Sequence, residues 1–358
     1  MNWSYLKPVF ENKRVFLTGH TGFKGAWMLQ ILQQLGADVK GYALAPETSR
    51  DLYNEINGDD LCYSSVIADL RDLKTLQGEL VRFEPDFVFH LGAQALVRKS
   101  YQEPVETFMI NAQGTVHILE AIRALTKPCI ALMITTDKVY ENPERGNAFS
   151  EDDKLGGYDP YSASKAAAEI VIDSYRRSFF HPEKYSQHQK AIASVRAGNV
   201  IGGGDWSEDR IVPDIVRAIE RRENVVLRNP ESVRPWQHVL EPVGAYLHLA
   251  AKMTEAPAKL STAFNFGPEP EDMLTVKALT EIFLERFGAQ TQYQQKENPE
   301  AVHEAKLLML DSSKAKQQLE WRPLLDAKAA IGWTADWYAD KRSAAEKCKE
   351  QITAYFGS

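Results

Sequence analysis

Short apolar runs alternate with segments of helical periodicity along the first half of the chain. Runs typical of buried strands lie at residues 14–18, 38–44, 65–68, 86–91, 129–135 and 191–196. Apolar residues recur at helical spacing in residues 26–35, in a segment that ends near residue 83, in 104–125 and in 160–178. Strands that alternate with helices in this way form a parallel, doubly wound sheet. We therefore expect an α/β fold of the Rossmann type.

The pattern changes after residue 196, where loops rich in Gly, Trp, Arg and Pro separate the helices. A chain of 358 residues is long enough for two domains that share a cleft. We expect a dinucleotide-binding domain in residues 1–190 and a smaller C-terminal α/β lobe, which binds substrate, in residues 191–358. Segments near 191–200 and 240–267 are expected to return to the first domain.

The composition is that of an ordinary globular protein, with 44% hydrophobic and 25% charged residues. A net charge of −7 argues against general affinity for nucleic acid or anionic membranes. Cys62, Cys129 and Cys348 lack the spacing of metal ligands and suit a reducing compartment. No apolar run approaches the ~20 residues that span a bilayer, and the first residues lack the apolar core of a signal peptide. We expect a cytoplasmic protein that binds no metal, nucleic acid or membrane.

A glycine-rich turn follows the first predicted strand and precedes the first long helix. Its glycines have the spacing Gly-x-x-Gly-x-x-Gly, and the turn comprises Gly19, His20, Thr21, Gly22, Phe23, Lys24 and Gly25. Missing side chains allow a tight turn, close approach of a pyrophosphate to backbone amides, and close packing of helix on strand. A purely structural turn is the alternative. Its place between a strand and a helix favours a dinucleotide site.

The residues that would choose between NAD and NADP leave that choice open. An acidic residue at the end of the second strand would bind the ribose hydroxyls of NAD, but residues 42–46 contain none. Arg50 could face a 2′-phosphate, although a lone loop arginine is more often solvated. Asp69 and Leu70, after the third strand, are well placed for the adenine, and Asp69 could equally cap the following helix.

Tyr161 and Lys165 stand four residues apart in a predicted helix, which places both side chains on one face. A nearby ammonium favours the phenolate and so lowers the pKa of a phenol. The pair therefore predicts a tyrosine that acts as a base. A solvated surface pair is the more frequent explanation of this pattern in isolation, so the prediction depends on the other motifs.

Several motifs, taken together in their order along the chain, resemble the extended short-chain dehydrogenase/reductase family. They are Thr18-Gly19-x-x-Gly22-x-x-Gly25, Asp69-Leu70, His90-Leu91-Gly92-Ala93, Asn111, Thr135-Thr136-Asp137 and Tyr161-x-x-x-Lys165. Near the C-terminus, residues 264–267, 310–315 and 319–323 are similar to the sugar-nucleotide branch of that family. The resemblance covers nearly the whole chain. It implies NAD as the cofactor, bound by Gly19, His20, Thr21, Gly22, Phe23, Gly25, Asp69, Leu70, Leu91, Ala93, Tyr161 and Lys165.

The segment after the fifth strand distinguishes the reactions of this branch. Epimerases carry small hydroxyl residues there, whereas nucleotide-sugar 4,6-dehydratases carry Thr-Asp-Glu; here the residues are Thr136, Asp137 and Lys138. The lysine in place of Glu, with the glycine turn and Gly202–Trp206, most resembles dehydratases that act on CDP-glucose. The resemblance implies a hydro-lyase that forms a 4-keto-6-deoxy sugar, an early step toward deoxy sugars of surface polysaccharides. An exposed turn with a charge pair is the alternative for Asp137 and Lys138.

The resemblance also assigns roles within the reaction. Thr136 would hydrogen-bond the 4-hydroxyl of the sugar while Tyr161 removes its proton, and hydride would pass from carbon 4 to NAD. Asp137, if protonated in a desolvated pocket, would protonate the departing 6-hydroxyl. Lys138 would either remove the carbon 5 proton or stabilise the enolate while another group removes it.

Substrate contacts are expected mainly in the second half of the chain. Asn199 aligns with a phosphate-contacting Asn and Arg234 with a diphosphate-binding Arg of the family; Trp206 and Arg210 are further candidates. Nothing in these residues selects cytosine. A dehydratase of another nucleotide sugar, an epimerase and a non-catalytic dinucleotide sensor remain alternatives. The helices predicted at 104–125 and 160–178 are expected to form a homodimer interface as in the family, with a tetramer as the other possibility.

Overall fold

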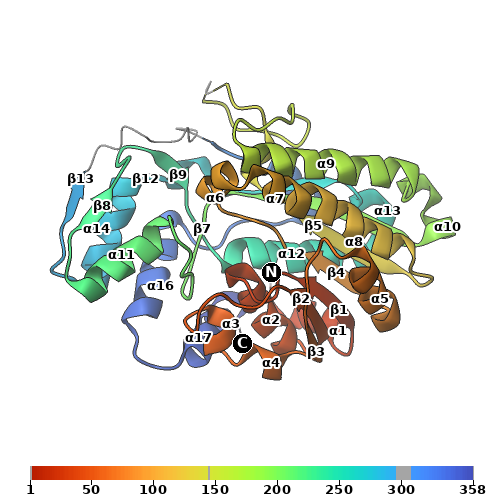
Figure 1. Ribbon diagram of the computed structural model, residues 1–358, viewed down its shortest axis with the longest axis horizontal. Coiled ribbons are helices and arrows are strands. Elements are labelled where there is room, and N and C mark those ends of the chain that lie inside the picture. Colours follow the sequence, from red (N-terminus) through yellow and green to blue (C-terminus); the bar gives the residue numbers. More distant parts are fainter. Residues whose placement is uncertain (1, 144–145, 296–307, 358) are drawn as a thin grey trace.

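Seven parallel strands form the central sheet of the computed structural model, which describes residues 2–143, 146–295 and 308–357 (Figure 1). The strand order is β11-β6-β5-β4-β1-β2-β3, and each neighbouring pair runs parallel. The chain thus winds outward from β1 in both directions, and the predicted doubly wound sheet is confirmed. The strands are β1 (Arg14–Thr18), β2 (Asp38–Ala43), β3 (Ser64–Ile67), β4 (Phe87–His90), β5 (Cys129–Ile134), β6 (Lys190–Ala197) and β11 (Ala263–Phe266).

Alternate side chains of these strands pack on opposite faces of the sheet. In β1, Val15 and Leu17 belong to one buried cluster and Phe16 to another. The first cluster is covered by α1 (Trp3–Phe10), α2 (Phe23–Gln34), α12 (Leu240–Glu255) and α17 (Ala344–Phe356). The second is covered by α5 (Leu73–Phe83), α8 (Gly114–Arg123) and α9 (Pro160–Ser178). Because both faces are covered, the central strands β4 and β5 are buried at every residue and mostly apolar, which is why they are recognisable in the sequence.

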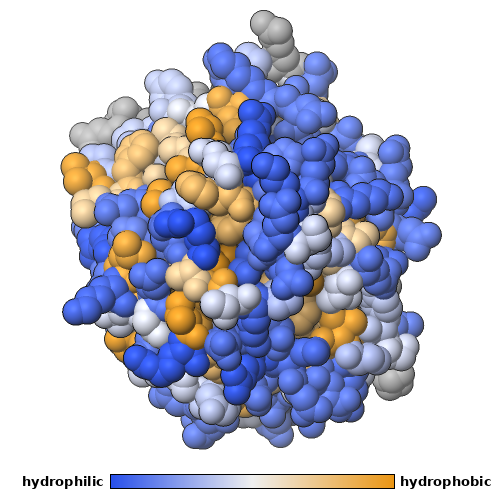
Figure 2. All heavy atoms as spheres, turned by 90° about the vertical axis from the view of Figure 1, so that its right-hand side faces the viewer, coloured by the Kyte–Doolittle hydropathy of each residue, from blue (hydrophilic) through white to orange (hydrophobic). Residues whose placement is uncertain are grey.

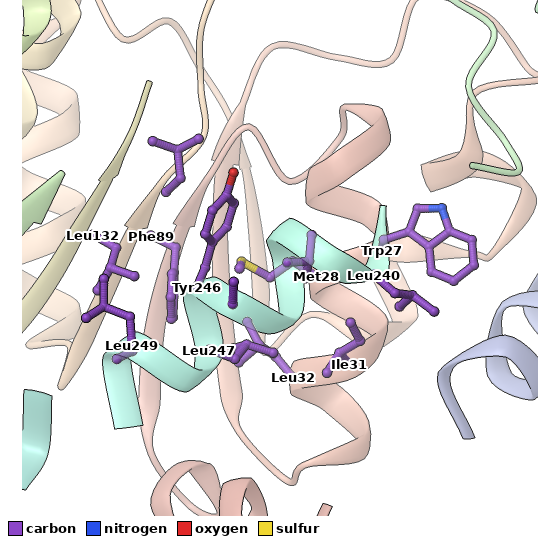
Figure 3. Close-up of a cluster of buried hydrophobic side chains, with 14 of the residues drawn as sticks. Trp27, Met28, Ile31, Leu32, Phe89, Leu132, Leu240, Tyr246, Leu247 and Leu249 are labelled. Carbon is purple, nitrogen blue, oxygen red and sulfur yellow. The ribbon is translucent and has the colours of Figure 1, made fainter. Parts of the chain in front are cut away.

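Helices α2 and α12 lie side by side against the first face (Figure 3). Leu32 and Ile31 of α2 meet Leu247 and Leu240 of α12, and all four side chains are fully buried. This packing holds the N-terminus of α2 at the carboxyl ends of the strands. Ligands of such sheets bind at this edge.

A smaller lobe lies beyond the carboxyl ends of the strands, at the left of Figure 1. Its core is a third apolar cluster. The lobe contains α11 (Ile211–Arg221), α14 (Val276–Phe287), α16 (Ala327–Ala339), and the strand pairs β8 (Val225–Leu227) with β13 (Tyr293–Gln295) and β9 (Val233–Pro235) with β12 (Met273–Thr275). A further short pair, β7 (Val200–Ile201) with β10 (Gln237–His238), follows β6. The lobe boundary at residue 190 stays a prediction.

The segment 104–125, expected to be one helix, is interrupted by a wider turn. It consists of α7 (Pro104–Phe108), the π-helical turn η1 (Met109–Gln113) and α8. Such turns are frequent at functional sites, and this one carries Asn111. The remaining helices are α3 (Leu52–Glu55), α4 (Gly58–Leu61), α6 (Val97–Gln102), η2 (Asp137–Val139), η3 (Pro182–Lys184), α10 (Tyr185–His188), α13 (Pro257–Leu260), η4 (Pro270–Asp272) and α15 (Ser313–Leu319). None of the helices in the described ranges is both long and apolar enough to cross a bilayer.

Candidate active site

The glycine turn brings three segments of backbone into direct contact. Gly19 adopts φ +74°, and a Cβ atom there would lie 2.8 Å from the backbone nitrogen of Gly92, in the loop after β4. A Cβ atom on Gly25 would lie only 2.0 Å from the carbonyl oxygen of Gly19, so α2 packs directly on the turn. Side chains are excluded at both positions. Gly22, by contrast, is exposed, and a Cβ atom there would meet nothing closer than 3.5 Å among the described atoms.

This geometry fits a dinucleotide. Gly22 is the N-cap of α2, and no described side chain bonds to the first amides of the helix. Unoccupied amides at a helix N-terminus bind phosphate oxygens. Asp69 and Leu70 follow β3, and Leu91 and Ala93 follow β4, so all four lie at the same edge of the sheet.

Two residues of the turn support it from within. His20 is fully buried, its Nε2 lies 2.9 Å from the Ser65 hydroxyl, and burial lowers its pKa to about 4, so the ring is neutral near pH 7. Thr21 donates to the carbonyl oxygen of Leu44 at 2.9 Å. Phe23 is half-buried and lies against Gly202 of the loop after β7. The structure therefore places the side chains of His20 and Thr21 in contact with β2, β3 and the segment after β2 rather than in the open space above Gly22.

Asp69 is held by the neighbouring arginine. The carboxylate accepts hydrogen bonds from the side chain of Arg71 at 2.6 to 3.1 Å, and Arg71 also pairs with Glu106 at 3.3 Å. The hydrogen bond from Arg71 keeps the pKa of Asp69 below its usual value. The carboxylate is therefore charged and fixed in orientation after β3.

Helix α9 presents Tyr161 and Lys165 to the carboxyl ends of β4 and β5. Asp159 caps the helix by accepting from the Ser162 backbone at 2.9 Å, and Pro160 occupies the first helical position. Both predicted side chains are buried, and the Lys165 ammonium donates to the carbonyl oxygen of Ile134 at 2.9 Å. The two residues lie on one helix face inside the protein, not on a solvated surface.

Asn111 joins the elements around this pair. Its side chain donates to the Gln94 carbonyl oxygen at 3.0 Å and to the Ser164 hydroxyl at 2.9 Å, and it accepts from the Gln94 amide at 2.9 Å. Ser164 in turn donates to the Tyr161 carbonyl oxygen. The π turn thus connects the loop after β4 to the start of α9.

The expectation of a lowered pKa for Tyr161 is wrong for this structure. Burial raises the pKa of the phenol, and the cations that oppose the rise are Lys138 first and Arg210 after it, with a hydrogen bond to Thr136. Burial also lowers the pKa of Lys165 to about 8, although the carboxylate of Glu169 acts to raise it. The cost of desolvation, which depends on tertiary packing, therefore outweighs the neighbouring charges.

The turn after β5 brings Thr136, Asp137 and Lys138 next to Tyr161. Asp137 is fully buried, and its Oδ1 accepts from the Thr136 hydroxyl at 2.8 Å and from the Lys138 ammonium at 3.1 Å. Its Oδ2 is also buried but has no hydrogen-bond partner among the described residues. A Cβ atom on Gly198 would lie 3.2 Å from that oxygen. A buried oxygen without a partner, beside a glycine, is suited to contact a ligand.

Lys24 joins this group, although sequence reasoning did not single it out. It is half-buried, and burial lowers its pKa to about 8. The charges of Arg210 and Lys165 lower this pKa further, whereas the charge of Asp137 raises it. Lys138 pairs with Asp137 at 3.1 Å, and the charges of Arg210, Lys165 and Lys138 all act on Lys24. A lysine in the first turn of a helix is unfavourable because its charge opposes the helix dipole. This unusual position of Lys24 is the feature of the sequence that could have indicated a functional role.

Tyr246 is a second residue that the sequence did not reveal. It lies on α12, is fully buried, and its hydroxyl has no hydrogen-bond partner within the described part of the chain. In Figure 3 the ring points out of the apolar cluster. Burial raises its pKa, and the charges of Tyr161 and Asp137 add to the rise, so the hydroxyl lies near these two residues.

A buried ion pair supports the turn from behind. Arg196 on β6 and Glu169 on α9 lie 2.8 Å apart with side chains 4% and 2% exposed. Glu169 also accepts from Thr135 and Ser194, and Arg196 donates to the Tyr140 hydroxyl at 2.7 Å. Thr135 directly precedes Thr136, so this network supports the turn that carries Thr136, Asp137 and Lys138.

The four residues predicted to bind substrate, Asn199, Trp206, Arg210 and Arg234, differ in their surroundings. Asn199 is half-buried one residue after Gly198, and Arg234 is half-buried on β9. Arg210 is the N-cap of α11 and acts electrostatically on Tyr161 and Lys24. The Trp206 ring instead contacts Arg50, whose Cζ lies 3.6 Å from the ring centroid, and meets the Tyr338 ring edge-on. Asn199 thus lies next to Gly198 and the charge of Arg210 acts on Tyr161, whereas Arg234 lies on β9 of the smaller lobe and Trp206 packs against side chains. No cluster of three or more potential metal ligands occurs among the residues described.

Comparisons with known proteins agree with this geometry. A model of the GDP-mannose 4,6 dehydratase family matches residues 16–332. The chain belongs to this family. The CDP-glucose 4,6-dehydratase of Salmonella typhimurium is 44% identical over 332 residues, which cover 93% of this chain and 92% of the relative. The dTDP-glucose 4,6-dehydratase of Streptomyces antibioticus is 28% identical, with 94% and 96% covered.

Solved structures show the same fold. A dTDP-glucose 4,6-dehydratase from Streptomyces venezuelae, solved with NAD, superposes with a TM-score of 0.76 at 22% identity, covering 92% of this chain and 98% of that one. The prediction of a Rossmann-type fold is therefore confirmed. The prediction that the chain is a nucleotide-sugar dehydratase, and hence a hydro-lyase, is confirmed as well. The roles of the individual site residues stay predictions.

Proposed function

We propose that this protein is a CDP-glucose 4,6-dehydratase, which converts CDP-glucose into CDP-4-keto-6-deoxyglucose and water. The observation that carries the proposal is the 44% identity to an enzyme of that name over almost the full length of both chains. The buried Asp137 and adjacent Lys138, at the end of β5, supply the acid and the cation that such a dehydration needs.

The cofactor of this reaction would be NAD. The residues that fit it are the open turn at Gly22, the uncapped amides of α2, and Asp69 and Leu70 after β3. When bound, NAD accepts a hydride from carbon 4 and later returns it to carbon 6, so that it is not consumed. Arg50 pairs with Glu220 at 2.6 and 3.0 Å, and this engagement favours NAD over a cofactor with a 2′-phosphate.

The first step is oxidation at carbon 4. Tyr161, as phenolate, removes the proton of the 4-hydroxyl, while Thr136 orients that hydroxyl from the neighbouring turn. The phenolate must form against burial, so the nearby cations Lys138 and Arg210 are required to stabilise it. Lys165, one helical turn after Tyr161 on α9, adds a buried positive charge.

The second step is loss of water from carbons 5 and 6. The new ketone acidifies the carbon 5 hydrogen; a base removes that proton, and Asp137 gives a proton to the departing 6-hydroxyl. Lys138 either takes the carbon 5 proton or stabilises the enolate, and its ammonium is already bonded to Asp137 at 3.1 Å. Solvent deuterium exchange at carbon 5 in Lys138→Met decides its role, because exchange at the wild-type rate would contradict both alternatives.

The diphosphate of the substrate needs positive charges beside it. Arg234 on β9 and Arg210 before α11 would supply these charges, and Asn199 would supply a side-chain amide. Trp206, which packs on Arg50, would act by shaping this wall rather than by stacking on the base. The specificity for cytosine rests on the similarity to the Salmonella enzyme.

Three other functions make different demands on the site. An epimerase or a dehydratase of another nucleotide sugar would share the turn and Tyr161, but an epimerase has no use for the buried acid Asp137. A non-catalytic sensor has no use for the whole constellation. The test is incubation with CDP-, dTDP-, UDP- and GDP-glucose, followed by the ultraviolet absorbance of 4-keto-6-deoxy sugars in base. Product from CDP-glucose alone supports the proposal, and product from another sugar with none from CDP-glucose contradicts it.

The enzyme would act as a homodimer. Helices α7 and α9 pack against each other, and with η1 they carry apolar side chains that remain exposed, namely Val105, Phe108, Met109 and Ile170. Val105 and Ile170 are 73% and 60% exposed. Figure 2 shows apolar side chains gathered toward the left of the face that it presents. Exposed apolar patches of this kind mark interfaces.

Solution mass tests the dimer. We expect Ile170→Glu to shift the protein to monomers in light-scattering measurements. Leu324→Glu changes an apolar side chain of similar exposure, 52%, outside these helices and serves as the matched control. A wild-type monomer, or equal effects of both changes, would contradict this interface. Location in the cytoplasm stays a prediction.

A further inference from the structure

The loop Gly204–Arg210 leads from β7 to α11, and side chains of the first domain hold it at two places. Asp209 accepts from Arg98 of α6 at 3.2 Å and from Arg228 at 2.7 Å. At the other end of the loop, Trp206 lies under the guanidinium of Arg50, which belongs to the segment after β2. The loop therefore lies against the first domain at both contacts.

The contact made by Arg50 combines two interactions. Its two terminal nitrogens donate to the two carboxylate oxygens of Glu220 on α11, at 3.0 and 2.6 Å. Its carbon Cζ lies 3.6 Å from the centroid of the Trp206 ring. A single exposed ion pair is weak, but a planar guanidinium that forms two parallel bonds and also stacks is fixed in orientation.

Trp206 transmits this contact to the loop. Trp206 also meets Tyr338 of α16, whose ring lies edge-on to the indole with the centroids 5.3 Å apart and whose hydroxyl donates to the Asp205 carbonyl oxygen at 2.6 Å. Asp205 lies 3.8 Å from Arg210 at the end of the loop. Loss of the Arg50 contact would therefore leave Trp206, and the loop that ends at Arg210, less firmly held.

Arg210 is the functional end of this chain of contacts. Its charge is one of those that oppose the burial-driven rise in the pKa of Tyr161. Its charge also acts on Lys24 in the first turn of α2, directly after the glycine turn. The position of the loop therefore affects both the base and the neighbourhood of the dinucleotide.

We propose that Arg50 is a positioning residue. By clasping Trp206 and Glu220, it holds the Gly204–Arg210 loop and the second lobe against the first domain. This contact holds the loop that ends at Arg210 in place beside the first domain and slows the release of the bound dinucleotide. The inference rests on the proposed function, because it takes NAD as the cofactor.

The experiment measures release of NADH and the pH dependence of turnover. The variants are Arg50→Ala, Arg50→Lys and Glu220→Gln. The control is Arg286→Ala, because Arg286 forms an equally short two-bond pair with Asp336, at 2.7 and 2.8 Å, between two helices of the second lobe. NADH release is followed by its fluorescence after displacement with excess NAD.

We expect Arg50→Ala to accelerate release about fivefold or more, from the loss of an ion pair and a stacked cation. Arg50→Lys should resemble Arg50→Ala, because an ammonium cannot form the two-bond stacked arrangement. High salt should accelerate release from the wild type more than from Arg50→Ala, because the ion pair is exposed. We also expect the pH profile of turnover to move to higher pH in Arg50→Ala. When Arg210 moves away, the pKa of Tyr161 rises, so the phenolate forms only at higher pH.

The possible failures are distinct. If Arg50→Ala and Arg286→Ala release NADH at the wild-type rate and share its pH profile, the positioning role is wrong. If Arg50→Lys behaves as the wild type does, the two-bond stacked geometry is not what matters and the proposal is likewise wrong. If the wild type binds no NADH, the proposed function itself is wrong.

Discussion

The pair formed by Glu169 and Arg196 allows the most quantitative prediction. The two side chains are 2% and 4% exposed and their charged atoms lie 2.8 Å apart. Burial alone would raise the pKa of Glu169, but Arg196 and the hydrogen bonds from Thr135 and Ser194 hold it below its usual value. Glu169→Gln removes the negative charge and leaves a guanidinium buried without a counter-ion. Breaking a buried pair in this way typically costs about 3–5 kcal/mol in the free energy of unfolding.

The assay is urea unfolding followed by circular dichroism, with Asp336→Asn as the control. Asp336 pairs with Arg286 at a similar distance but on the surface, so its loss should be several-fold smaller. The double variant Glu169→Gln/Arg196→Met should recover part of the loss, because it removes the stranded charge as well. Equal losses in Glu169→Gln and Asp336→Asn would refute the reasoning.

The same substitution should change the pH dependence of activity. The Glu169 carboxylate opposes the fall in the pKa of Lys165, which is about 8. Without that carboxylate the pKa falls further, so the ammonium is lost at lower pH. We expect the alkaline limb of the turnover profile to move to lower pH in Glu169→Gln, and an unchanged limb would contradict the electrostatic link.

Three further outcomes are expected. Lys138→Met removes the first of the cations that oppose the raised pKa of Tyr161, so the pH profile of carbon 4 oxidation should move to higher pH; a shift to lower pH would contradict this assignment. Tyr161→Phe should lower kcat roughly 10²- to 10⁴-fold while calorimetry shows unchanged CDP-glucose binding; loss of binding instead would indicate a structural role. Gly25→Ala should abolish NAD binding, because its Cβ would lie 2.0 Å from the Gly19 carbonyl oxygen. The control is Gly78→Ala in α5, where no described atom lies within 4 Å, and which should bind NAD normally and unfold no more readily.

The sequence predicts the sheet and the turn well because their causes are local. Strands buried on both faces, such as β4 and β5, are mostly apolar, and Gly25 is required by its close contact with the Gly19 carbonyl oxygen within one turn. The helix of Tyr161 and Lys165 is likewise marked by its cap at Asp159 and by Pro160. These features need no knowledge of distant residues.

Other features depend on contacts between distant segments, and the sequence does not reveal them. The pKa of Tyr161 follows from how deeply α9 is buried, not from the spacing of Lys165. Glu220 lies 170 positions from Arg50, so the ion pair between them has no local signal. The π turn at Asn111 is similar in composition to the helices on either side of it.

The central claim is that hydride leaves carbon 4 and returns to carbon 6 of the same sugar. Its most direct test is incubation with CDP-glucose that carries deuterium at carbon 4, followed by mass spectrometry and NMR of the product. We expect CDP-4-keto-6-deoxyglucose with the deuterium on carbon 6. Deuterium retained at carbon 4 of a CDP-hexose that has not lost water would contradict the claim and indicate an epimerase instead.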